Sequence, residues 1–148
     1  MEIIDSKDAS AVQAHINMLQ GIINRMAQNS ANCKVWAITL VSALLALRVD
    51  EGARQSLLYY LPIVGLFWLD CYYLGLERRI IGQQRDFVKR LNNKENVANR
   101  IFRVESGEGC GALKLLCRLW DMLKAALSIS TLPFYLIISI IVYSVLSE

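Results

Sequence analysis

The sequence predicts an all-α membrane protein with three spanning helices, and three observations lead to this class. Apolar residues make up 55% of the 148 residues, more than a soluble domain of this length usually carries. These residues gather in three long segments, 35–47, 57–76 and 125–146, and the third carries no charge. Basic residues, in contrast, are concentrated between the second and third segments. A helix of about 20 apolar residues is long enough to cross a bilayer.

The N-terminal half predicts one long helix after a polar lead formed by residues 1–10. Asp8 or Ser10 is expected to cap this helix, which then runs from residue 11 to residue 48 without a proline. Its apolar positions recur at helical spacing, at Ile16, Leu19, Ile22, Ile23 and Met26. Such a helix would be roughly 55 Å long and would extend from the membrane into the cytoplasm.

Residues 48–56 are expected to form a short external turn, after which a second helix returns over residues 57–91, with a possible kink at Pro62. The domain 11–91 is thus an antiparallel helical hairpin with spans at 35–47 and 57–76. Pairing positions about the turn places Trp36 level with Trp68, which indicates the inner membrane boundary. About 20 Å of hydrocarbon contact then remains, so either the bilayer thins or the span is longer than this boundary implies.

Residues 92–124 are expected to form a basic cytoplasmic segment. Within it, 92–96 is a predicted turn, 97–104 is a helix or a short strand, and 105–111 is a glycine-rich loop. An amphipathic helix over 112–124 is expected to lie in the inner interface. The third span, 125–146, then follows and is expected to bend at Pro133.

Charge distribution predicts the orientation of the chain. Residues 77–124 hold eleven Lys and Arg against six Asp and Glu, so the positive-inside rule places this segment in the cytoplasm. Two crossings precede it, so the N-terminus is expected in the cytoplasm and the C-terminus in the periplasm. The first apolar segment begins too late for a cleavable signal peptide and would act as its own insertion signal.

Asp70 is the most informative single residue, because a carboxylate inside an apolar span needs an ion-pair partner, access to water or a functional role. The hairpin pairing places Lys34 at its level, and Arg25 or Arg79 is an alternative partner. Two interpretations stay open. Asp70 is either a structural ion pair that locks the hairpin, or it lines a conduction path and switches partners on gating.

Two stripes on the first helix predict a homo-oligomer. Amide side chains suit hydrogen bonds between neighbouring helices, and small side chains allow close packing in lipid. A solvated face and a pore lining are the respective alternatives. The predicted seam comprises the amide stripe Asn17, Gln20, Asn24 and Gln28, and the small-residue face Thr39, Ser42, Ala43 and Ala46.

Basic residues after the second span are expected to contact anionic lipid, or else a nucleotide messenger or a soluble protein partner. Aromatic residues are sparse between them, so nucleic acid is not expected. These candidate contacts are Arg78, Arg79, Arg85, Lys89 and Arg90.

The sequence predicts neither an enzyme nor a bound metal or cofactor. The single histidine, His15, stands near no nucleophile motif, and no HExxH or GxSxG occurs. The four cysteines form no CxxC pair, and they are expected to stay reduced on the cytoplasmic side. The lone GxGxG loop at 107–111 follows no clear strand, so it is expected to be a flexible loop and not a phosphate site.

Three runs resemble a family of small bacterial membrane proteins associated with anti-phage defence and CRISPR neighbourhoods. They are HINMLQGIINRMAQNS at 15–30, WAITLVSA at 36–43 and FWLDCYYLGLER at 67–78. The resemblance covers about residues 12–92 and implies an effector that assembles in the inner membrane and perturbs it during infection. The third span departs from a plain two-helix effector. A membrane anchor or scaffold that recruits a defence partner is the alternative function.

Overall fold

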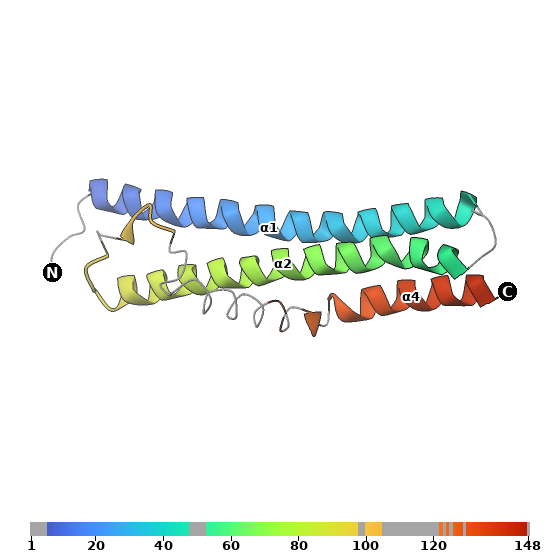
Figure 1. Ribbon diagram of the computed structural model, residues 1–148. Helices are drawn as coiled ribbons and strands as arrows, with labels where there is room; N and C mark the ends of the chain where they lie inside the picture. The colour runs from blue at the N-terminus through green and yellow to red at the C-terminus, as the bar shows by residue number, and fades with distance from the viewer. Residues whose placement is uncertain are drawn as a thin grey trace.

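The computed structural model describes residues 6–47, 53–97, 100–104, 122, 124, 126–128 and 130–147. Within these residues the chain contains helices and turns and no strand, so the all-α prediction is confirmed. The long helices α1 (Ser6–Leu47) and α2 (Ala53–Asn92) lie side by side and run in opposite directions (Figure 1). The shorter α4 (Leu132–Ser147) lies along the first half of α2.

Both long helices begin earlier than the sequence predicts. Since α1 starts at Ser6, Asp8 and Ser10 lie inside the helix, and the prediction that either caps it at residue 11 is wrong. With 42 residues, α1 is roughly 63 Å long. The second helix already begins at Ala53, inside the predicted loop, and it continues through Pro62.

The third apolar segment forms a shorter helix than expected. It begins at Leu132 and has 16 residues, which correspond to roughly 24 Å. Pro133 therefore lies in the first turn and does not bend the helix. A proline is tolerated there because the amide it lacks would have no partner within the helix. Leu127 and Ser128 precede α4 in a non-helical turn.

The predicted turn after α2 is confirmed, and it has a Schellman geometry. The Lys94 amide donates to the Leu91 carbonyl at 3.1 Å, and the Glu95 amide donates to the Arg90 carbonyl at 3.1 Å. Lys94 itself has a φ of 59°, the left-handed conformation that this motif requires. These bonds satisfy carbonyls that the end of the helix would otherwise leave open.

In the described part of 97–104, Arg100 has 3-10 helical geometry, Ile101 and Phe102 form a tight turn, and no strand is present. Phe102 has a φ of 62°. The glycine-rich loop at 105–111, and all of the predicted amphipathic helix 112–124 except residues 122 and 124, lie outside the described residues.

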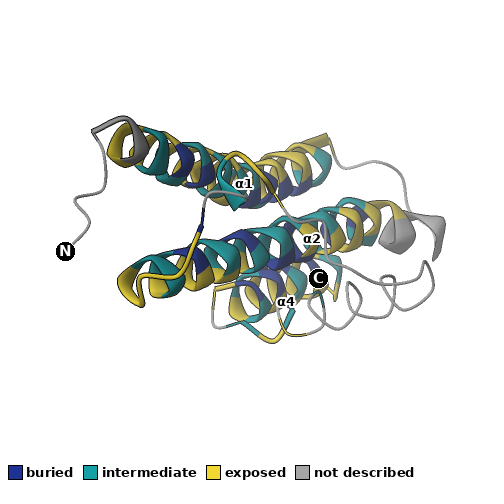
Figure 2. Ribbon diagram, turned by 90° about the vertical axis from the view of Figure 1, so that its left-hand side faces the viewer, coloured by how far each residue is buried: buried dark blue, intermediate teal, exposed yellow. Residues whose placement is uncertain are grey.

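The core lies where the three helices meet, and Figure 2 shows the buried faces turned toward one another. Buried positions are spaced by three or four residues in the part of α1 from Ser30 to Val41 and in α4 from Tyr135 to Val142, as expected for one packed face of a helix. On α1 the central contact residues are small, since Ser30, Cys33 and Ala37 are 5%, 1% and 0% exposed. The main apolar cluster comprises Ala37, Val41, Tyr59, Ile63, Tyr135, Ile138 and Val142.

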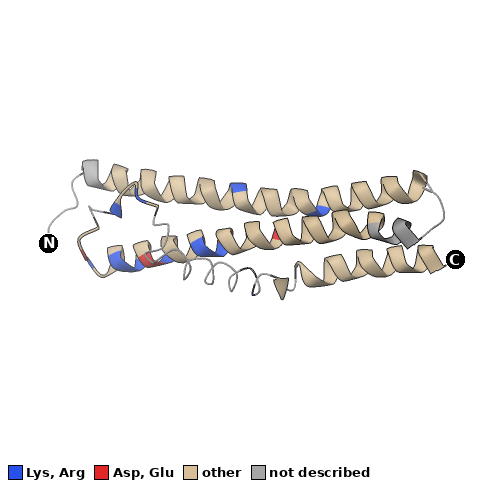
Figure 3. Cartoon of the chain, in the orientation of Figure 1, with Lys and Arg blue, Asp and Glu red and all other residues tan. Residues whose placement is uncertain are grey.

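Large apolar side chains cover the outside of one half of the molecule. Leu47 is 71% exposed, Leu61 is 66% exposed and Tyr143 is 69% exposed, one residue on each of the three helices. Charged residues lie mainly in the other half (Figure 3). Within the described residues, one helix is long and apolar enough to cross a membrane, namely the stretch Ala9–Leu47 of α1. We call the outer surface of 35–47, 58–68 and 136–145 the apolar band.

Candidate functional site: a buried ion pair between the long helices

The charged pair in the middle of the molecule joins α1 to α2. Lys34 Nζ lies 2.6 Å from Asp70 Oδ2. The Ser30 hydroxyl donates a hydrogen bond to Asp70 Oδ1, and Lys34 Nζ donates one to Ser30 Oγ at 3.2 Å. Ser30 and Lys34 are one helical turn apart, so they present both groups to the same carboxylate. The three side chains form a closed network, at the register that pairing about the turn predicted.

Burial makes this network sensitive to the loss of any member. The Asp70 side chain is 0% exposed and that of Lys34 is 18% exposed. Two free thiols, Cys33 and Cys71, are also buried beside it. Charges removed from water to this extent are tolerated only with good geometry and further hydrogen bonds, which Ser30 supplies here.

Residues at the start of α4 complete the surroundings of this network between α1 and α2. The Tyr135 hydroxyl is close enough to Asp70 to interact with its carboxylate, although it lacks the geometry of a hydrogen bond. Thr131 is 0% exposed, and its hydroxyl has no hydrogen-bond partner within the described residues. Leaving a buried hydroxyl unpaired costs about 1–3 kcal/mol, so this corner is polar but incompletely satisfied.

The alternative partners suggested for Asp70 are placed elsewhere. Arg25 is exposed on α1, and Arg79 is half-buried on α2. Within the described chain, Asp70 forms its ion pair with Lys34 and with neither of these arginines. Complete burial of the carboxylate matches a structural lock better than a water-lined path through a single copy of the chain.

The predicted seam does not pack inside the molecule. Each member of the amide stripe, Asn17, Gln20, Asn24 and Gln28, is exposed, and so is each member of the small-residue face, Thr39, Ser42, Ala43 and Ala46. Both surfaces are therefore open to lipid or to another chain. The small residues that do pack are Ser30, Cys33 and Ala37, which sequence reasoning missed. Their spacing of three and four residues was the available signal.

Arg78 has a structural role that the sequence did not indicate. It donates to the Lys124 carbonyl at 3.0 Å and to Ser128 Oγ at 2.9 Å, and so fastens α2 to the segment before α4. Arg85 and Lys89 are exposed, as lipid or partner contact would require. Arg90 instead pairs with Asp86 at 3.0 Å.

These contacts define a helical protein with one long apolar helix and a buried ion pair. Within the described residues, no three His, Cys, Asp or Glu side chains gather as a metal site. Compared with protein-family models, curated proteins and solved structures, the chain has no match. Its function therefore has to be argued from its own surfaces.

Proposed function

We propose that the three helices span a membrane through the apolar band. The observation that carries this proposal is the exposure of large apolar side chains on all three helices in the same half of the molecule. Val64 is 63% exposed and Ile140 is 62% exposed, for example. A contiguous apolar surface of this kind marks a membrane or protein contact. The charge-free stretches 35–47, 55–69 and 132–147 all belong to this half of the molecule.

The internal ion pair supports a longer span than the one between Lys34 and the external turn. Because Lys34 pairs with Asp70 inside the helix bundle, lipid can continue past this level. The next charged residues are Arg25 on α1 and Glu77 and Arg78 on α2. From Arg25 to Leu47 there are 22 rises of 1.5 Å, or roughly 33 Å, which matches the ~30 Å hydrocarbon thickness.

The favoured function is that of a homo-oligomeric inner-membrane effector that permeabilises the membrane in bacterial anti-phage defence. The exposed amide stripe on α1 supports assembly. Within the described chain, its side chains form hydrogen bonds with other residues of α1 and with no other element. Gln13 donates to Asn17 at 3.0 Å and Gln28 to Asn32 at 3.1 Å. The defence role rests on the sequence resemblance. Asp70 acts here as the lock that holds each subunit together.

Release of a trapped dye from lipid vesicles tests this function. The wild-type protein is expected to release dye and to form oligomers in detergent. Changing Asn17 and Asn24 together to Ala should weaken both. The control changes Asn92 and Asn93 together to Ala, which removes the same chemistry from the end of α2 and should leave release intact. A folded wild-type oligomer that releases no dye would contradict the pore-forming function.

A membrane anchor or scaffold is the second candidate, favoured by the fully buried Asp70 and by the exposed Arg85 and Lys89. In that case, a soluble partner should co-purify through the basic face, and overexpression should be harmless. Changing Arg85 and Lys89 to Gln should abolish the co-purification without altering the helix content.

A further inference from the structure

A second polar site lies at the far end of the bundle from the apolar band, where the turn 100–104 closes over α1 and α2. His15 is 2% exposed, and its ring centroid is 4.5 Å from that of Phe87. The backbone amide of Phe102 donates to His15 Nδ1 at 3.1 Å. Because Nδ1 accepts this bond, the imidazole proton resides on Nε2, which is then a donor.

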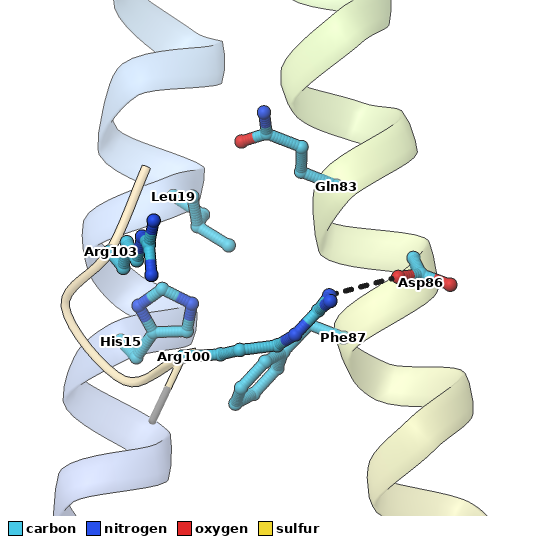
Figure 4. A pocket seen from close by; sticks show the side chains of 7 residues that line it. All are labelled: His15, Leu19, Gln83, Asp86, Phe87, Arg100 and Arg103. Atoms are coloured by element: carbon cyan, nitrogen blue, oxygen red, sulfur yellow. Dashed lines mark hydrogen bonds and ion pairs between the residues drawn. The ribbon is translucent and has the colours of Figure 1, made fainter. Parts of the chain in front are cut away.

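A cavity of about 40 Å³ opens beside this histidine (Figure 4). Arg100 is held by Asp86 at 3.4 Å, and Asp86 is also bonded to Arg90 at 3.0 Å. The Arg103 guanidinium lies beside the imidazole and makes no ion pair within the described chain. The cavity is lined by His15, Leu19, Gln83, Asp86, Phe87, Arg100 and Arg103.

Donors outnumber acceptors around this cavity. Two guanidinium groups face one carboxylate, and that carboxylate already receives two arginines. A water needs about 10–15 Å³ of such space, so the cavity has room for a few waters or one tetrahedral oxyanion. Planar guanidinium groups bind phosphate oxygens with two parallel hydrogen bonds. We propose that this cavity binds a phosphate group, held by Arg103, Arg100 and the Nε2–H of His15.

The turn that carries the arginines is constrained in a way that suits a binding site. Phe102 adopts a left-handed φ of 62°, a conformation that is unfavourable for a non-glycine residue. Its amide bond to His15 and the Arg100–Asp86 pair hold the turn in this conformation. Because residues 100 and 103 flank the strained position, the two guanidinium groups reach the cavity from one turn.

A phosphate group could come from a lipid headgroup or from a soluble molecule, and the geometry favours the soluble source. This step rests on the proposed membrane placement. Arg25, at the proposed boundary, is ten residues from His15, or roughly 15 Å along α1. The headgroup layer is only about 5–8 Å thick on each side, so a lipid phosphate does not reach the cavity. The ligand class is therefore a soluble phosphate-bearing small molecule.

Nuclear magnetic resonance of the imidazole tests the proposal directly, because His15 is the only histidine of the chain. The full chain, labelled at histidine and held in detergent, is titrated with inorganic phosphate, with sodium chloride at matched ionic strength as the reference. We expect a saturable shift of the Nε2 resonance, while Nδ1 keeps the signature of an acceptor. Arg103→Gln should weaken the apparent affinity about tenfold, whereas Arg85→Gln, an exposed change of equal charge on α2, should leave it unchanged.

Three results would overturn the phosphate site. They are no saturable shift with wild-type protein up to tens of millimolar phosphate, an equal shift with chloride, or an equal affinity in Arg103→Gln. The wild-type titration decides the matter even if a variant fails to fold. Vesicles with anionic headgroups that shift the resonance in place of free phosphate would contradict the soluble source. The readout needs no permeabilisation, so it fails or succeeds independently of the dye-release experiment.

Discussion

The molecule holds two charged clusters that differ in almost every physical respect. The Lys34–Asp70 pair, in the middle of the bundle, spans 2.6 Å, and its side chains are 18% and 0% exposed. The second cluster lies near the end of α2 and comprises Asp86, Arg90, Glu95 and Arg100; we call it the basal cluster. Its three ion pairs measure 3.0–3.4 Å, and their side chains are 38–50% exposed. The first cluster joins two long helices, whereas the second joins the end of α2 to the turns that follow it.

This difference teaches where electrostatics contributes stability in this chain. Exposed pairs are screened by water and salt, and they contribute about 0–1 kcal/mol each. A buried pair is not strongly stabilising compared with an apolar replacement, but breaking it strands a charge and costs about 3–5 kcal/mol. A substitution that breaks the central pair is therefore expected to destabilise the fold strongly, whereas substitutions in the basal cluster should have small effects on stability.

The largest effect is expected from breaking the central pair on one side. Lys34→Met leaves the Asp70 carboxylate buried without its cation and should lower the free energy of unfolding by about 3–5 kcal/mol. Unfolding in mixed detergent micelles, followed by circular dichroism, measures the change. Adding Asp70→Leu should recover most of the loss, since both charges are then absent.

The double variant also separates the two roles of Asp70. If the pair is only a lock, folding and dye release return together in Lys34→Met/Asp70→Leu. A variant that folds as well as wild type and releases no dye would show that the carboxylate serves conduction. A Lys34→Met protein as stable as wild type would contradict the lock.

A smaller effect is expected from the hydroxyl that completes the network. Ser30→Ala removes the hydrogen bond to the Asp70 carboxylate and should cost about 1.5–3 kcal/mol, the range for bonds to charged groups. Ser42→Ala is the matched control, because Ser42 is exposed on the same helix. Equal stability of the two variants in the same denaturation experiment would argue against a Ser30 contribution.

Acid should loosen the contact between His15 and the turn 100–104. Burial lowers the pKa of His15 below its usual 6.5, and Asp86, Arg100 and Arg103 face the ring from α2 and the turn. The unfolded chain thus binds the proton more readily, so this contribution to stability is complete above pH 6.5 and is lost as pH falls through the folded pKa. Intrinsic amide exchange slows as pH falls, so the loosening should appear as a drop in the protection factor of the Phe102 amide on acidification. His15→Gln should remove the excess pH dependence, and an unchanged pH profile in that variant would contradict the assignment.

The smallest effect is expected in the basal ion pairs. Asp86→Asn removes one partner of Arg90 and one of Arg100 and should cost at most about 1 kcal/mol at low salt, because the pairs are exposed. The difference from wild type should shrink further at 1 M salt, where screening acts within about 3 Å. A loss as large as that of Lys34→Met would remove the contrast between the two clusters.

The sequence predicted the central pair because helix periodicity and an antiparallel return are local rules, and together they bring positions 34 and 70 to one level. It did not predict which face of α1 packs. The small-residue face that the sequence predicted as a packing surface, at Thr39 and Ser42, is exposed, whereas Ser30 and Ala37 pack against α2. That choice depends on which partner surface is available, and a single helix does not encode it locally.

Long-range contacts were also beyond the sequence. The bond from Arg78 to the Lys124 carbonyl joins residues 46 positions apart, and the bond from Phe102 to His15 joins residues 87 positions apart. A run of basic residues after a spanning segment predicts contact with lipid. The pattern does not reveal that one of these residues, Arg78, binds the segment before α4. The late start of α4 likewise follows from Pro133, which suits a first helical turn better than a helix interior.

Depth-dependent fluorescence quenching tests the central claim, that the apolar band lies in a membrane, most directly. Trp36 and Trp68 are 55% and 60% exposed within this band, and Trp120→Phe leaves them as the only tryptophans. In vesicles, we predict strong quenching by lipids brominated along their acyl chains and weak quenching by aqueous acrylamide. Strong quenching by acrylamide together with none by brominated lipid would contradict the account.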